Sequence, residues 1–365
     1  MLKHDRPRQD HPVRLPITTA SGEEMRPEQA DTLARRYGEI VKYSLVLLVT
    51  LGAFYLLYDK LKETSWQEIQ LAWQKIPAQN VAIAFALTAL NFCLMTGYDL
   101  IAVRYLNKSL PIRNVMAGAV IGYAFSNVFG WLLGGTAVRY RLYRRWGFSP
   151  VEIIAFVTIL SITFWLGMFL LAGIAFTALP IKLPPDAENS LFLSHEVWGW
   201  IFLSIAALYL LATAVIRKPI PMKHYRYALP PLKLSSLQLA VSACDFVLTS
   251  AVLYMLLPPD ITGAEGINFS TVLISYLTAM IAVVVTHVPG GVGVLETGLL
   301  TMLPDSATAA IFAGALMFRV VYYLIPAAIA GVLWLCIELS WKYSKTPEAS
   351  PTASPVPVPL PSQAD

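Results

Sequence analysis

The first candidate site is a stretch in which an apolar segment breaks and then runs into basic residues. Residues 125–148 read FSNVFGWLLGGTAVRYRLYRRWGF. Backbone that leaves helical geometry at membrane depth is tolerated only where protein or a water-filled cavity surrounds it. The amide side chain of Asn127 lies at this break, where it serves either a ligand or the contact between two helices. The predicted break residues are Gly130, Gly134 and Gly135.

Arginine gives this stretch its chemistry. The arginines that close it are Arg139, Arg141, Arg144 and Arg145. Hydrocarbon excludes a guanidinium group, whereas a phosphate accepts two parallel hydrogen bonds from it. We predict that Arg139 and Arg141, which lie nearest the break, bind a lipid head group, and that the other two meet anionic lipid at the surface. In the alternative interpretation the cluster only keeps its loop in the cytoplasm.

Three further charged side chains lie inside apolar segments, where ionised groups are costly and are usually functional. Asp99, in GYDLIAVRYL, either serves a ligand or pairs with Arg104 or with an arginine of a loop. Asp245, in SACDFVLTS, is the deepest acid. Arg319, in AGALMFRVVYYLIP, is its expected partner, and such a pair is either structural or part of a gate.

A second break is predicted in HVPGGVGVLE, residues 287–296. A half-helix should begin near Val292, and its free N–H groups either hold an anion or are capped by Glu296. His287 has no second histidine near it in the sequence, which favours a structural role and predicts no metal site. The residues that break the helix are Pro289, Gly290 and Gly291.

The elements that must position these residues are membrane helices. Of the 365 residues, 56% are hydrophobic and only 14% are charged; soluble domains have about 25% charged residues. We predict an all-α polytopic membrane protein, with a membrane domain at 37–343 between disordered segments at 1–36 and 344–365. Eight apolar runs cover 41–58, 81–103, 115–138, 151–179, 197–216, 237–257, 269–288 and 307–339, and a shorter one covers 291–303.

The charges of the loops orient these runs, because short basic loops stay in the cytoplasm. The loops at 104–113 and 217–226 are basic, and the loop at 258–268 is acidic. If the run at 115–138 crossed fully, the arginine cluster would lie outside. We therefore predict that this run enters from the cytoplasm, turns and returns, and that 269–303 does the same from the opposite face. Two such segments are typical of transporters with inverted repeats.

Three segments carry a resemblance to a known family. Residues 127–146, NVFGWLLGGTAVRYRLYRRW, are similar to the membrane domain of the lysylphosphatidylglycerol synthetase/flippase family, which includes the multiple peptide resistance factor. HVPGGVGVLETGLL at 287–300 and FRVVYYLIPAAIAGVLW at 318–334 agree in the same order. Long family members carry a C-terminal domain that transfers lysine or alanine from tRNA to phosphatidylglycerol. Beyond Leu339 this chain has a proline-rich segment instead, so the resemblance implies the translocating part without aminoacyl transfer.

The resemblance and the residues together predict a lipid flippase of the bacterial inner membrane, with both termini cytoplasmic. Its cargo would be a phospholipid, with aminoacylated phosphatidylglycerol as one candidate. Two other functions stay open: a non-transporting subunit that recruits a separate lipid or glycan enzyme, and a carrier of polyprenyl-phosphate sugars. The sequence offers no catalytic arrangement, cofactor motif or nucleic-acid-binding motif, and a homo-oligomer stays open. The predicted head-group ligands are Arg139, Arg141, Asp99, Glu296, Asp245, Arg319, Asn127 and His287.

Overall fold

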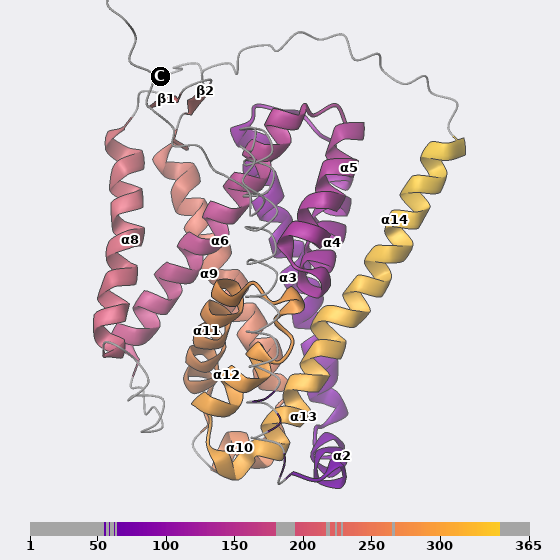
Figure 1. Ribbon diagram of the computed structural model, residues 1–365, viewed down its shortest axis with the longest axis vertical. Coiled ribbons are helices and arrows are strands. Elements are labelled where there is room, and N and C mark those ends of the chain that lie inside the picture. The colour runs from indigo at the N-terminus through magenta and orange to yellow at the C-terminus, as the bar shows by residue number, and fades with distance from the viewer. Residues whose placement is uncertain are drawn as a thin grey trace, which may run out of the picture. The chain divides into compact units, whose positions relative to one another are not determined.

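The computed structural model describes most of the chain, and what it describes is a bundle of helices (Figure 1). The apolar run at 41–58, apart from Tyr55 and Tyr58, and the terminal segments 1–36 and 344–365 lie outside the described residues. The described residues are 64–179, 194–216, 220–222, 225–227, 229–264 and 267–343, together with Tyr55, Tyr58 and Lys62.

Six of the described helical segments are long and apolar enough to cross a membrane, with mean hydropathy between 1.6 and 2.3. They confirm the prediction of an all-α polytopic membrane protein. One small exception to the helical fold is an antiparallel pair of short strands, β1 (Ile220–Met222) and β2 (Tyr225–Tyr227). The six segments are α3 (Ala78–Tyr105), α6 (Pro150–Ala178), α8 (His195–Val215), α9 (Leu232–Met255), α11 (Phe269–Thr286) and the stretch Asp305–Tyr343.

The last of these segments contains more than one kind of helix. It consists of η3 (Asp305–Ala307), α13 (Thr308–Phe318), η4 (Arg319–Leu324) and α14 (Ile325–Tyr343). η4 is a π-helical turn, a wider turn that is frequent at functional sites. Because η4 begins with Arg319, this arginine projects from an irregular part of the helix.

The first predicted break is a reversal of the chain. α4 (Ile112–Phe129) ends at Gly130, whose φ of +81° is readily adopted only by glycine. A π-helical turn, η1 (Trp131–Thr136), and then α5 (Ala137–Arg145) run back along α4. We call α4, η1 and α5 the first hairpin.

The second predicted break is also a reversal. α11 ends at His287, which has a left-handed backbone conformation with φ 55°. A short 3₁₀ turn, η2 (Pro289–Gly291), leads into α12 (Val294–Met302), which packs back against α11. We call α11, η2 and α12 the second hairpin. It starts at the opposite end of the bundle from the first hairpin (Figure 1).

The tips of the two hairpins meet. A Cβ atom on Gly290 would lie 2.8 Å from the carbonyl oxygen of Val128, and one on Gly130 would lie 3.9 Å from the Cα atom of Pro289. The predicted path, in which two broken segments enter from opposite ends, is therefore confirmed. Which of the two ends faces the cytoplasm stays a prediction.

Basic segments that were predicted on one side gather at one end of the bundle. Lys108, after α3, pairs with Glu152 at the start of α6 at 2.9 Å. Arg145, at the end of α5, lies 5.0 Å from the ring centroid of Trp341 near the end of α14. The loops after α3 and α5 and the end of α14 therefore share one side, as the charge argument required.

The opposite end is closed by two short helices. α2 (Trp66–Gln74) packs on α13, and α10 (Pro259–Ala264) follows α9. Lys75, after α2, pairs with Asp260 of α10 at 2.6 Å.

The outward faces of α8 and α14 expose large apolar side chains, as lipid-facing surfaces do. Leu208, Val215 and Val332 are 63%, 70% and 64% exposed. Such surfaces are rare on soluble proteins and match hydrocarbon.

Candidate functional site

A buried ion pair holds the first hairpin to α3. Arg139 donates from Nη2 to Asp99 Oδ1 at 3.2 Å, and the hydroxyl of Tyr143 donates to Asp99 Oδ2 at 2.7 Å. Arg139 and Tyr143 lie four residues apart on α5 and so share one face. The guanidinium also lies over the ring of Tyr123, 4.2 Å from its centroid. Asp99 is 0% exposed and Arg139 is 4% exposed, so this pair is enclosed by protein.

The first hairpin also has unused hydrogen-bonding groups. Nε of Arg139, Nδ2 of Asn127 and Oγ1 of Thr136 are buried, and they have no hydrogen-bond partner within the described part of the chain. Two of these groups are N–H donors and the third is a hydroxyl, which can donate as well. Donors of this kind suit anionic oxygens such as those of a phosphate.

A second ion pair closes the second hairpin. Arg319 donates from Nε to Glu296 Oε1 at 2.6 Å and from Nη2 to Glu296 Oε2 at 3.0 Å. The same guanidinium donates to the carbonyl oxygen of Gly290 and, at 2.9 Å, to that of Gly291. Glu296 also caps α12, because its Oε2 accepts from the N–H of Gly293 at 2.8 Å. One arginine therefore satisfies both the carboxylate and the broken backbone.

The expected pairing of Asp245 with Arg319 is wrong. Arg319 is fully engaged by the second hairpin, whereas Asp245 is surrounded by uncharged donors. Asn91 Nδ2 donates to Asp245 Oδ1 at 2.8 Å, and the hydroxyl of Tyr98 donates to Oδ2 at 2.8 Å. The hydroxyl of Tyr322 lies 2.6 Å from Asn91 Nδ2, which ties this group to η4.

Aromatic rings join the three carboxylates into one buried path. The ring centroid of Tyr98, whose hydroxyl donates to Asp245, lies 5.7 Å from the ring centroid of Tyr123. The Tyr123 ring in turn contacts the guanidinium of Arg139. On the other side of Asp245, the ring centroids of Tyr322 and Tyr323 lie 5.7 Å apart, and Cζ of Arg319 lies 4.9 Å from the ring centroid of Tyr323. Asp245 therefore lies between the two arginine–carboxylate pairs.

Two predicted head-group ligands lie apart from this path. Arg141 is 63% exposed and forms a bidentate pair with Glu338 of α14, with Nη2 to Oε2 at 2.9 Å. His287 is exposed, and its Nδ1 lies 2.9 Å from the carbonyl oxygen of Val285. The structure thus brings together Asp99, Arg139, Asp245, Glu296 and Arg319, but neither Arg141 nor His287.

Sequence reasoning missed the uncharged members of the site. Asn91 and Tyr98 of α3 and Tyr322 of η4 hold Asp245 and its surroundings. A signal was available for Asn91, an amide within the apolar run 81–103. Tyrosine gives no such signal, because its apolar ring fits a membrane segment whether or not its hydroxyl binds a polar group.

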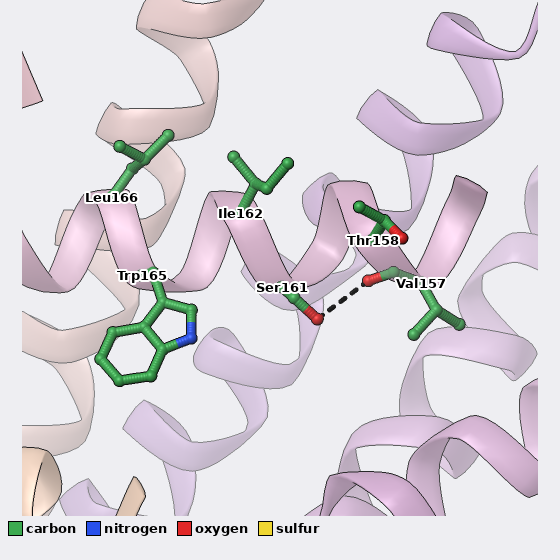
Figure 2. A pocket seen from close by; sticks show the side chains of 6 residues that line it. All are labelled: Val157, Thr158, Ser161, Ile162, Trp165 and Leu166. Atoms are coloured by element: carbon green, nitrogen blue, oxygen red, sulfur yellow. Dashed lines mark hydrogen bonds between the residues drawn. The ribbon is translucent and has the colours of Figure 1, made fainter. Parts of the chain in front are cut away.

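A separate hollow lies along α6. It measures ≈ 440 Å³ and is lined by side chains that all come from this helix, as Figure 2 shows. Its hydroxyl groups are satisfied by their own helix: Ser161 donates to the carbonyl of Val157 at 3.0 Å, and Thr158 donates to that of Ile154 at 2.9 Å. Without a charged group this hollow does not suit a head group.

Comparison with known proteins places the chain among membrane proteins of one kind. Residues 43–330 match the family described as "Lysylphosphatidylglycerol synthase TM region". An uncharacterized protein of Synechocystis sp. is 34% identical over 80% of this chain and 89% of that protein. Inner membrane protein YbhN of Escherichia coli is 32% identical over 82% of this chain and 93% of that protein. Phosphatidylglycerol lysyltransferase of Staphylococcus haemolyticus is 23% identical over 83% of this chain but only 35% of that protein.

Proposed function

Because the chain belongs to the lysylphosphatidylglycerol synthase TM region family, we propose that it binds a phospholipid and translocates it across the cytoplasmic membrane. The observation that carries this proposal is the meeting of two hairpins from opposite ends, each held by a buried arginine–carboxylate pair. Broken segments that meet near mid-bundle are the usual place for a transported substrate.

Arg139 is the group proposed to receive the lipid phosphate. Its Nε has no hydrogen-bond partner among the described residues, and Asn127 Nδ2 offers a second donor on the same hairpin. A phosphate that competes with Asp99 for the guanidinium would free this carboxylate. A cationic head group, such as an aminoacyl amine, would then have an acid to pair with. Since both side chains are enclosed in the described conformation, the hairpins must separate for a head group to enter.

Aminoacyl transfer is not part of the proposal. The relative whose name describes a lysyltransferase matches this chain over only 35% of its own length. The proposal therefore concerns movement of lipid, and the basic end of the bundle is assigned to the cytoplasmic side by its charge.

The test is lipid movement in liposomes that contain the full chain. Fluorescent phosphatidylglycerol in the outer leaflet is bleached by dithionite, and the rate at which inner-leaflet lipid becomes accessible is measured. We expect Arg139→Ala to slow this rate about tenfold, equivalent to about 1.4 kcal/mol in the barrier. The matched control is Arg144→Ala, which should retain the rate. Arg144 is exposed, and its guanidinium donates to the carbonyl of Phe148 at 3.1 Å.

Two results would contradict the proposal. Liposomes with the wild-type chain that move lipid no faster than protein-free liposomes would remove the transport function and favour a non-transporting subunit. Equal rates for Arg139→Ala and Arg144→Ala would remove the assigned role of Arg139.

A further inference from the structure

Among the described residues, one of the three buried carboxylates has no cationic partner. Asp99 pairs with Arg139, and Glu296 pairs with Arg319. Asp245 is 3% exposed, and no arginine, lysine or histidine of the described residues forms an ion pair with it. An ionised carboxylate buried without a counter-charge costs several kcal/mol, which a proton removes. The charge balance at this position therefore calls for a proton.

The groups around Asp245 can accommodate either charge state. Oδ2 accepts from the hydroxyl of Tyr98 at 2.8 Å, and Oδ1 accepts from Asn91 Nδ2 at 2.8 Å. A hydroxyl hydrogen rotates, so Tyr98 can donate to the carboxylate or accept from the acid. Oδ1 of Asn91 is buried and has no hydrogen-bond partner in the described part of the chain. This oxygen is an acceptor that a protonated Asp245 needs, reached by rotation of the amide.

In the described part of the chain, the titratable side chains that face Asp245 are tyrosines. Tyr98 of α3 and Tyr322 of η4 belong to its hydrogen-bonded network. Tyr123 of α4 and Tyr276 of α11 are near enough to interact with its charge. The nearest arginines are engaged by their own carboxylates, so the surroundings neither fix Asp245 as an anion nor supply a second acid.

We propose that Asp245 is a proton-binding site in the core of the bundle, and that its loading is coupled to the two hairpins. The coupling runs through residues on either side. Tyr98 is next in sequence to Asp99, which holds the first hairpin. Asn91 contacts Tyr322 of η4, the turn that carries Arg319 and so holds the second hairpin. A proton on one carboxyl oxygen of Asp245 changes this oxygen from an acceptor into a donor, so the contact at this oxygen, with Tyr98 or with Asn91, has to rearrange.

The site itself is independent of the proposed lipid transport, whereas the coupling rests on it. The test therefore reads the proton directly. The purified full chain in lipid nanodiscs is followed by infrared difference spectroscopy while the medium is acidified from about pH 9 to about pH 5.5, where exposed Asp and Glu side chains are still almost all ionised. We expect a carbonyl band of a protonated carboxylic acid to appear in the wild type and to be absent from Asp245→Asn. Asp260→Asn, at an exposed aspartate, should keep the band.

Tyr98→Phe provides a second variant in case Asp245→Asn does not fold. Loss of one donor to the ionised form should move the midpoint of the band about one pH unit higher. No titrating band in the wild type, or a band unchanged in both variants, would overturn the site. If the midpoint of the band changed with the sodium concentration, the ligand of Asp245 would be a metal cation, and the proposed proton site would also be overturned. An intact band without lipid movement would defeat the transport proposal and leave the site standing.

Discussion

Replacing Arg319 by methionine should destabilise the fold more than replacing any exposed arginine. Methionine keeps much of the apolar length but donates no hydrogen bond. Glu296 would keep only the N–H of Gly293, and the carbonyl groups of Gly290 and Gly291 would lose their donor. Removal of one partner from a buried pair costs about 3–5 kcal/mol, and this is the loss in unfolding free energy that we expect.

Arg141→Met is the matched control. Both arginines make a bidentate contact with a glutamate, but the side chain of Arg319 is 13% exposed and that of Arg141 is 63% exposed. Exposed pairs contribute about 0–1 kcal/mol. Unfolding of the full chain in mixed micelles by a denaturing detergent gives both free energies under the same conditions. The arginine–glutamate contact is bidentate in both pairs, so the comparison measures the effect of burial together with the two carbonyl contacts that Arg319 makes.

The double variant Glu296→Gln/Arg319→Met tests the electrostatic part of the reasoning. With no charge left in the site, it should be more stable than Arg319→Met alone by about 1–3 kcal/mol. If Arg319→Met destabilised the chain no more than Arg141→Met, the pair would not close the second hairpin. If the double variant regained nothing, the penalty would come from packing instead of an uncompensated charge.

Three other outcomes are expected. Gly290→Ala should lower the unfolding free energy by about 1–2 kcal/mol, because φ is +63° and the Cβ atom would lie 2.8 Å from a carbonyl of the first hairpin; Gly331→Ala, with open space around its Cβ atom, should not lower it in the same assay. Tyr143→Phe should lower the unfolding free energy by about 1.5–3 kcal/mol, since it removes a donor to a buried carboxylate, and an unchanged value would argue against that bond. In a cysteine-free background, Gln74→Cys and Arg144→Cys should react with an impermeant maleimide from opposite sides of the membrane, and labelling of both from one side would contradict the hairpin path.

The two chain reversals were predictable because the charges of the loops and the helix-breaking residues can both be read from their positions along the chain. A run at 115–138 that crossed fully would have left the arginine cluster with the acidic loops. The glycines at this run supplied a place to turn, and the structure turns at Gly130. The second reversal followed from the same counting and from the proline and glycines after His287.

The pairing of acids with arginines was harder to predict, because the depth of a residue in the membrane does not say which neighbouring helix its side chain faces. Asp245 and Arg319 lie deep in their helices, but depth says nothing of the direction in which a side chain points. That direction was readable in one case. Arg139 and Arg141 lie two residues apart, about 200° around a helix, so they could not both face one ligand. The structure has Arg139 facing Asp99 and Arg141 facing Glu338.

Both arginines that hold the hairpins adjoin a π-helical turn. η1 ends at Thr136, shortly before Arg139, and η4 begins at Arg319. A π-helical turn accommodates one residue more than an α-helical turn. If the π-helical turn shifted to a neighbouring position in the helix, each residue between its old and new positions would rotate by about 100° around the helix axis. A change of winding alone would then withdraw an arginine from its carboxylate. The helix would not have to unravel in hydrocarbon, where free backbone groups are most costly.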